Sequence, residues 1–274
     1  TAANGCTSAS SSTITEPTTL MASTFVDSNA TCLGFTDGGA TASASGGTMP
    51  YTYTWSNAAA TASITGIADG TYTVTITDNN ACTVINSATI TVVDTVKPTV
   101  LTQNINAYLD ATGNVSIIPA DVDNGSTDIC GAPTLNLDIT SFTCAEVGAN
   151  TVTLTATDVN SNVASATATV TVIDTIKPTV ITQNINAYLD ATGNVSIIPA
   201  DVDNGTTDIC GAPTLSLDVS SFTCSEVGAN TVTLTATDVN NNVASATATV
   251  TVIDTIKPTV ITQNINAYLD ATGN

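Results

Sequence analysis

The stretch TVTLTATDVNSNVASATATVTVID, residues 151–174, decides the fold of this protein. Its two runs alternate Val, Leu or Ala with Thr or Ser, and the polar residues 160–162 separate them. Alternation with a period of two and frequent β-branching predict half-buried strands over 151–159 and 163–174, joined by a tight turn. No stretch of useful length has a helical period. The sequence therefore predicts an all-β protein.

This hairpin belongs to an 80-residue repeat. Residues 94–173 and 174–253 align without a gap and differ at eight positions, each by a conservative change. Residues 254–274 then repeat the start of the unit. A fixed repeat of this kind indicates tandem domains, and its strand pattern predicts immunoglobulin-like β-sandwiches arranged end to end.

Further strands are expected before the hairpin. In the first copy they cover 98–110, 115–122 and 132–139, with the polar loop DNGSTDICG between the second and third. The first and last strands then run in the same direction. We therefore expect the linker, the loop after the second strand and the hairpin turn at one end of each sandwich.

The first third of the chain is built on a different unit. Residues 4–15, NGCTSASSSTIT, match residues 80–91, NACTVINSATIT, at an offset of 76 residues. Residues 1–16 are therefore expected to be the last strand of a preceding copy, and residues 17–93 one complete copy.

The composition excludes several classes of function. The chain has three Lys+Arg, 23 Asp+Glu and no His, which gives a net charge of -20. Nucleic acid and anionic membranes both require clustered cations, so neither is an expected partner, and no membrane insertion is expected in this segment. There is no GxSxG and no phosphate-binding glycine loop, and the acids recur identically in successive repeats. We therefore expect no enzymatic activity.

Two motifs in the first third resemble a known family. GGTMPYTYTWSN (46–57) and ITGIADGTYTVTITDNNAC (64–82) are similar to the SprB repeat of Bacteroidota gliding adhesins, with Ala81 where that family has Gly. The 80-residue units resemble the immunoglobulin-like, hyalin-type repeats that accompany such modules in large type 9 secreted proteins. Their marks are Asp-Thr-[Val/Ile]-Lys-Pro and Thr-Ala-Thr-Asp-Val-Asn.

The resemblance implies a long extracellular filament at the cell surface, used in adhesion or gliding motility. Its expected partners are surface polysaccharide or other cell surfaces, with possible self-association into filaments. Two other functions stay open from the residues. One is an array of carbohydrate-binding modules, and the other is a self-assembling filament or sheath subunit.

The acidic residues at the expected convergence point predict calcium binding. Calcium takes 6–8 oxygen ligands and suits Asp, Asn and backbone carbonyls. The alternative is that these residues only form turns and cap loops. The candidate ligands are Asp94, Asp121, Asp123, Asp128, Asp158, Asn160 and Asn162 in the first copy, Asp174, Asp201, Asp203, Asp208, Asp238, Asn240 and Asn242 in the second, and Asp110 in the turn of the first.

Seven cysteines without histidine or a CxxC motif predict disulfides in an oxidising compartment. Cys130 and Cys144 lie 14 residues apart, and Cys210 and Cys224 repeat that spacing. We expect each pair to form a disulfide within its repeat, and Cys32 to pair with Cys82. Cys6 is left for a cysteine upstream, although it is also open as a free thiol or an interchain bond.

Three aromatic residues alternate on one strand. Tyr51, Tyr53 and Trp55 share one face, which favours a hydrophobic core over an exposed sugar-binding ridge.

Threonines in the linkers are candidate glycosylation sites. Asp94-Thr95-Val96 and its two later copies fit the Asp-Thr-apolar pattern that Bacteroidota use for O-glycosylation. The resemblance gives Thr95, Thr175 and Thr255 as candidates, and a plain linker turn is the alternative.

Overall fold

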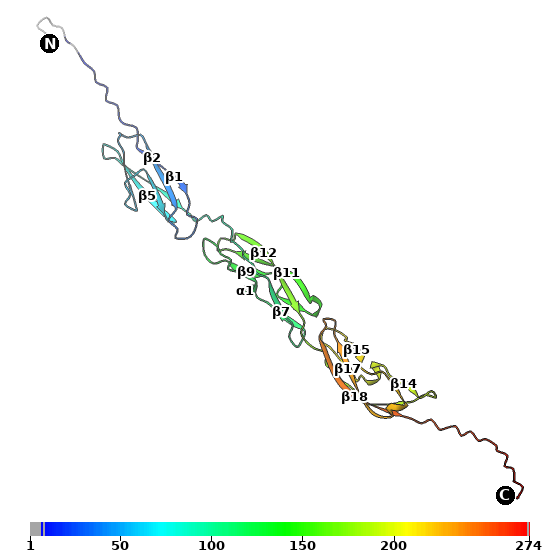
Figure 1. Ribbon diagram of the computed structural model, residues 1–274. Coiled ribbons are helices and arrows are strands. Elements are labelled where there is room, and N and C mark those ends of the chain that lie inside the picture. The colour runs from blue at the N-terminus through cyan, green and yellow to red at the C-terminus, as the bar shows by residue number, and fades with distance from the viewer. Residues whose placement is uncertain (1–6, 8, 273) are drawn as a thin grey trace. The chain divides into compact units, whose positions relative to one another are not determined.

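The computed structural model describes residues 7, 9–272 and 274. Strands dominate this part of the chain (Figure 1), and its helices are only three or four residues long. The all-β prediction is confirmed. The chain divides into two compact units, whose boundary passes through the repeat 94–173, so each sandwich is described by itself. The first unit comprises residues 1–103, 119–138 and 153–168, and the second comprises 104–118, 139–152 and 169–274.

The first sandwich consists of two three-stranded sheets, with orders β1-β2-β4 and β3-β5-β6. All pairings within these sheets are antiparallel. Its strands are β1 (Met21–Ser28), β2 (Gly38–Ser45), β3 (Thr52–Trp55), β4 (Ser63–Ile67), β5 (Gly70–Thr77) and β6 (Thr83–Ile90).

The aromatic residues in β3 and just before it lie in the core of this sandwich. Trp55 is 2% exposed, and its Nε1 donates a hydrogen bond of 3.0 Å to the Thr61 carbonyl. Tyr51 and Tyr53 are partly buried and pack against the hydrophobic cluster that contains Trp55 and Val74. Buried indole N–H groups need an acceptor, and this one has it. These side chains therefore form the core and not an exposed ridge.

Each 80-residue unit folds into a second type of sandwich. The first copy contains β7 (Ile105–Tyr108), β8 (Asn114–Ser116), α1 (Pro119–Val122), β9 (Thr134–Leu137), β10 (Ser141–Thr143), η1 (Cys144–Glu146), β11 (Gly148–Thr157) and β12 (Val163–Ile173). The second copy contains β13 (Ile185–Tyr188), β14 (Asn194–Ser196), α2 (Pro199–Val202), β15 (Thr214–Leu217), β16 (Ser221–Thr223), η2 (Cys224–Glu226), β17 (Gly228–Thr237) and β18 (Val243–Ile253).

The strand pairing of the two copies is the same and is immunoglobulin-like. One sheet has the order β7-β12-β11-β9, or β13-β18-β17-β15, and the other pairs β8 with β10, or β14 with β16. The first strand is parallel to the last in both copies, as the sequence predicted. The core of the second copy contains Leu189, Val202, Phe222, Val232, Leu234, Val250 and Val252.

The predicted hairpin is confirmed, since β11 and β12 follow the predicted strands to within three residues. The strand predicted over 115–122 is wrong in its second half. There β8 ends at Ser116, and Pro119 begins the helical turn α1. Proline has no N–H for a strand ladder, and its fixed φ suits the first position of a helix. The strand predicted over 98–110 is also shorter, because only β7 and two isolated bridges form there.

The described residues at both ends of the chain form no strands. Residues 265–268 correspond to β7 and β13, which pair with the last strand of their own repeat. The segment predicted as a strand within 1–16 corresponds to β6, whose partner is β5.

No helix in the described part of the chain has the length and apolar character needed to span a bilayer.

Candidate metal and disulfide sites at the ends of the sandwiches

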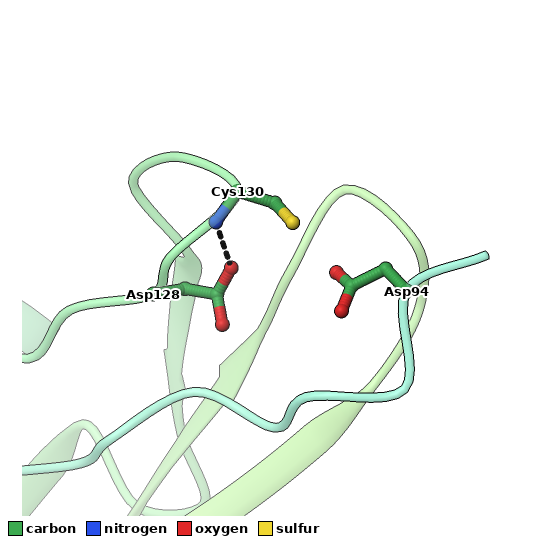
Figure 2. A group of neighbouring side chains, drawn as sticks. All are labelled: Asp94, Asp128 and Cys130. Atoms are coloured by element: carbon green, nitrogen blue, oxygen red, sulfur yellow. Dashed lines mark hydrogen bonds between the residues drawn. The ribbon is translucent and has the colours of Figure 1, made fainter. Parts of the chain in front are cut away.

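Three segments meet at the start of each 80-residue sandwich. Asp94 in the linker and Asp128 in the loop before β9 point toward one another beside Cys130 (Figure 2). One ligand atom from each of these residues lies within 4.8 Å of the other two. The hairpin turn joins them, because Asn162 Nδ2 donates to the Asp94 carbonyl at 3.2 Å. The predicted convergence of linker, loop and turn is therefore present.

The second sandwich repeats this arrangement. Asp174, Asp208 and Cys210 form the corresponding group, and Asn242 Nδ2 donates to the Asp174 carbonyl at 3.2 Å. Asp174 is the most enclosed of the four aspartates, with 6% of its surface exposed. The same geometry in both sandwiches indicates that the local sequence fixes it.

Each of these aspartates has one hydrogen-bonded oxygen and one that is not. Asp174 Oδ1 accepts from Ile176 N at 2.9 Å, and Asp208 Oδ2 accepts from Cys210 N at 2.9 Å. Asp174 Oδ2 and Asp208 Oδ1 are buried and have no hydrogen-bond partner among the described residues. In the first 80-residue sandwich, Asp94 Oδ2 and Asp128 Oδ1 are likewise buried without a hydrogen-bond partner. Buried carboxylate oxygens without partners are costly, so these four atoms favour a cation.

The cysteines beside these carboxylates, Cys130 and Cys210, cannot bind a metal as thiolates, because both are in disulfides. Cys130 is bonded to Cys32, and Cys210 is bonded to Cys144. The ligand atoms that remain are carboxylate oxygens, which hard cations such as calcium prefer. Asn240, in the turn after β17, has a further buried side-chain oxygen without a hydrogen bond.

Other predicted calcium ligands instead cap their own turns. Asp158 and Asp238 are buried, and each accepts three hydrogen bonds from the Asn residues of its hairpin turn. Burial raises the pKa of the Asp158 carboxyl, but the hydrogen bonds from Asn162 and Asn160 outweigh it and keep the pKa below its ordinary value. Asn162 and Asn242 stabilise these turns as hydrogen-bond donors to Asp158 and Asp238.

The remaining candidates also have local roles. Asp110 accepts hydrogen bonds from Thr112, which lower the pKa of its carboxyl. Asp123 and Asp203 close the loop after the helical turn, and the side chain that follows, Ser126 or Thr206, lowers their pKa. Asp201 Oδ2 accepts from Ile198 N at 2.7 Å at the start of α2. Asp121 occupies the corresponding position in α1, and Asn160 is exposed.

One aspartate of this kind was missed in the sequence. Asp78, in the turn after β5, is 6% exposed and accepts from the backbone N–H groups of Thr48, Asn80 and Cys82. The hydrogen bond from Thr48 is the main cause of its lowered pKa. The signal was available, because Thr-Asp-x-Asn occurs at 77–80 as it does at 157–160 and 237–240.

The predicted disulfide pairing is wrong. The structure bonds Cys32 to Cys130 and Cys144 to Cys210, with Cα–Cα distances of 5.3 and 5.1 Å. Each bond joins one sandwich to the next in sequence and lies within one compact unit. Cys82 and Cys224 are free and exposed. Cys6 lies outside the described residues.

In the second repeat, Cys210 and Cys224 cannot pair because they lie at opposite ends of the sandwich. Cys210 lies beside Asp174, at the end where β18 begins. Cys224 lies beside Gly193, which follows β13, where β18 ends. Between these ends β18 runs for 11 residues, or roughly 36 Å at ~3.3 Å per residue. A disulfide requires Cα atoms within about 7 Å.

The linker threonines are accessible. Thr95, Thr175 and Thr255 are exposed, each inside a turn in which the preceding aspartate accepts from the N–H two residues later. Glycosylation of these residues stays a prediction.

The fold and these sites define a tandem β-sandwich protein in which disulfides join successive sandwiches. Residues 24–60 match the SprB repeat family, which confirms the resemblance over that stretch. The serine-rich adhesin for platelets of Staphylococcus aureus strain MSSA476 is 29% identical over 183 residues, covering 62% of this chain and 8% of that protein. The form from strain MRSA252 is also 29% identical, covering 62% and 13%. The chain thus spans a small part of these relatives.

Solved structures of tandem domains are also similar. A titin fragment, domains I67–I69, has 11% identity and a TM-score of 0.40, covering 88% of this chain and 100% of that one. Sidekick-1 immunoglobulin domains 1–5 have 10% identity and a TM-score of 0.38, covering 86% and 60%. Because these scores are low, the fold assignment rests on the strand pairing described above.

Proposed function

We propose that this chain is a stalk segment of a surface adhesin, with a structural role in attachment or gliding motility and no catalytic one. The observation that carries the proposal is the pair of disulfides that join successive sandwiches. A bond between domains transmits tension even when a domain opens, which a load-bearing stalk requires. The similarity to adhesins supports the same role at a cell surface.

The chemistry of the 80-residue units favours a stalk over a carbohydrate-binding array. Each unit contains one Tyr and one Phe. Phe142 and Phe222 are 2% exposed and belong to the cores. Tyr108 and Tyr188 are exposed, but each is the only aromatic residue that its unit leaves accessible. A single tyrosine is a small stacking surface for a sugar.

Force spectroscopy on the intact chain tests the stalk proposal. The two disulfides span sequence separations of 98 and 66 residues. Reduction is expected to lengthen the fully unfolded chain by roughly 560 Å, at ~3.5 Å per residue. Cys144→Ser removes the shorter loop, so reduction of that variant should add only about 340 Å. Cys82→Ser should behave like the wild type, because Cys82 is free.

Two results would contradict the stalk proposal. One is an unfolded length that does not change on reduction, since the sandwiches would then not be tied. The other is glycan binding by the chain that is lost in Tyr108→Ala and Tyr188→Ala, which would favour the carbohydrate-binding array.

Calcium at the paired aspartates is the second part of the proposal. Asp174 and Asp208 each have a buried, unpartnered oxygen, and both residues belong to the same group of potential ligands. Lys177 lines a pocket with Asp208 but forms no ion pair with it. A bound calcium would neutralise the pair and hold the linker against the loop before β15. Backbone carbonyls and water would complete its coordination.

A further inference from the structure

We propose that Cys224 is the attachment point for a further sandwich, through a disulfide with the cysteine of that sandwich's Asp-Ile-Cys-Gly loop. The proposal concerns how sandwiches are linked and does not depend on adhesion. Its basis is the order of the bonds that the structure contains. Both bonds join a cysteine at the far end of one sandwich to the loop cysteine of the next 80-residue sandwich.

The surroundings of Cys224 match those of a cysteine that is already bonded. Cys144, its equivalent in the first copy, pairs with Cys210. Both cysteines begin a 3-10 helix after a threonine that caps it with the same capping box. Cys144 Sγ lies 3.9 Å from the Gly113 carbonyl oxygen, and Cys224 Sγ lies 3.6 Å from that of Gly193.

The glycine beside each sulfur leaves room for it. A Cβ placed on Gly113 would lie 2.9 Å from Cys144 Sγ, and one on Gly193 would lie 2.7 Å from Cys224 Sγ. Both glycines also have a φ of 75°. The free sulfur of Cys224 therefore has the local position of a disulfide sulfur, and its side chain is exposed.

The partner is identified by the loop that both existing bonds use. Cys130 and Cys210 lie in identical Asp-Ile-Cys-Gly loops, and in each the cysteine N–H is held by the aspartate two residues earlier, at 2.8 and 2.9 Å. In this loop, the Cys210 sulfur is bonded to that of Cys144. A further copy of the loop would present an equivalent cysteine sulfur to Cys224.

Cys82, the other free cysteine of the described chain, also lies at an end of its sandwich, as the bonded cysteines do. Cys82 lines a pocket with Pro17 and Leu20, where the chain enters the first sandwich. It is therefore at the entry end, as Cys130 and Cys210 are in their own sandwiches. The two free thiols of the described chain are the outermost ones of the bonded series.

The bond forms by oxidation of two thiols. Two thiols lose two electrons and two protons and form one S–S bond. A disulfide oxidant, such as oxidised glutathione, accepts them and becomes two thiols.

The test extends the intact chain by one sandwich. Because residues 254–274 repeat 174–194, a copy of residues 195–253 placed after Asn274 completes a third repeat. The copy carries Ser216→Thr as a mass marker, and its own equivalent of Cys224 is serine, so the Cys224 peptide comes only from the original chain. After oxidative folding with oxidised glutathione and digestion at aspartates, the Cys224 peptide is expected to be linked to the marked loop peptide. The Cys144–Cys210 link should remain as an internal standard.

Two controls make the result decisive. With Cys224→Ser, the loop cysteine of the added copy should become alkylatable. In the unextended chain, a maleimide should label Cys82 and Cys224 without reductant and leave Cys130 and Cys210 unlabelled. Alkylation of Cys224 in the extended chain while Cys144–Cys210 is intact would overturn the proposal. So would a bond from Cys224 to any cysteine other than the marked one.

Discussion

At the residue scale, the chemistry of this chain depends on how each aspartate uses its two oxygens. In the hairpin turns, Asp158 and Asp238 accept hydrogen bonds on both oxygens and are structural. At the start of each 80-residue sandwich, the linker aspartate, Asp94 or Asp174, has one oxygen held by the backbone and the other buried without a partner. The same residue type thus serves as a turn cap in one place and as a candidate ligand in another.

The calcium proposal predicts a difference between two sets of aspartate variants. Calcium at about 100 times its Kd should stabilise the chain by about 2.7 kcal/mol per site. Asp94→Asn with Asp174→Asn should abolish the rise in melting temperature, because each removes a ligand carboxylate. The control, Asp121→Asn with Asp201→Asn, should keep the rise. Calorimetry measures both.

Without calcium, the Asp94→Asn and Asp174→Asn variant should be at least as stable as the wild type, because it relieves repulsion between neighbouring carboxylates. A wild-type melting temperature that calcium leaves unchanged would end the calcium proposal. An equal calcium effect in both variants would show binding elsewhere.

At the element scale, short strands are held by a few large side chains. The strand β16 has three residues, and its central Phe222 is 2% exposed in the core of the second 80-residue sandwich. Its exposed neighbours are Ser221 and Thr223. A strand this short owes its place to the packing of that one side chain and to its pairing with β14.

Phe222→Ala should therefore destabilise the second repeat by about 3–5 kcal/mol, since it opens a cavity in the core. Urea unfolding followed by far-UV circular dichroism should show this loss. Fluorescence of Trp55, the only tryptophan, reports the first sandwich and should keep its midpoint.

The matched control is Phe25→Ala, in β1, because Phe25 is 71% exposed. That change should alter stability by less than about 0.5 kcal/mol. Equal effects of the two substitutions would contradict the packing described here.

At the scale of the whole molecule, two features set the behaviour: a net charge of -20 and covalent ties between sandwiches. The charge keeps copies of the chain apart at neutral pH and opposes lateral packing unless cations screen it. The disulfides close long loops that include parts of two sandwiches each. Reduction should therefore affect several sandwiches at once.

Acid should destabilise the molecule. Hydrogen bonds lower the pKa of Asp78, Asp110, Asp158 and Asp190 below the ordinary value of 3.8. A carboxyl with a lowered pKa in the folded state stabilises the fold above its unfolded pKa, and this stabilisation is lost as the pH falls through the folded value.

The melting temperature should therefore drop between about pH 5 and about pH 2, in the range where these groups take up protons. Scanning calorimetry at constant ionic strength measures it. A rise over that range would mean that relief of the negative charge outweighs the lost hydrogen bonds.

The sequence by itself determined the all-β fold, the repeat, the hairpin of β11 and β12 and the burial of Trp55. These depend on local periodicity and turn chemistry, which neighbouring residues carry. Topological reasoning also brought Asp94 and Asp128 to one end of the sandwich. The path after β8 departed from the prediction because Pro119 cannot continue a strand.

Only the tertiary structure decided the partners. Sequence spacing paired Cys210 with Cys224, yet a disulfide depends on distance in space, and these two cysteines lie at opposite ends of one sandwich. The same holds for the candidate ligands: fifteen Asp and Asn residues suit calcium by type, but hydrogen bonds within turns occupy many of them. Which oxygens are left free depends on three segments that are distant in the sequence and adjacent in the fold.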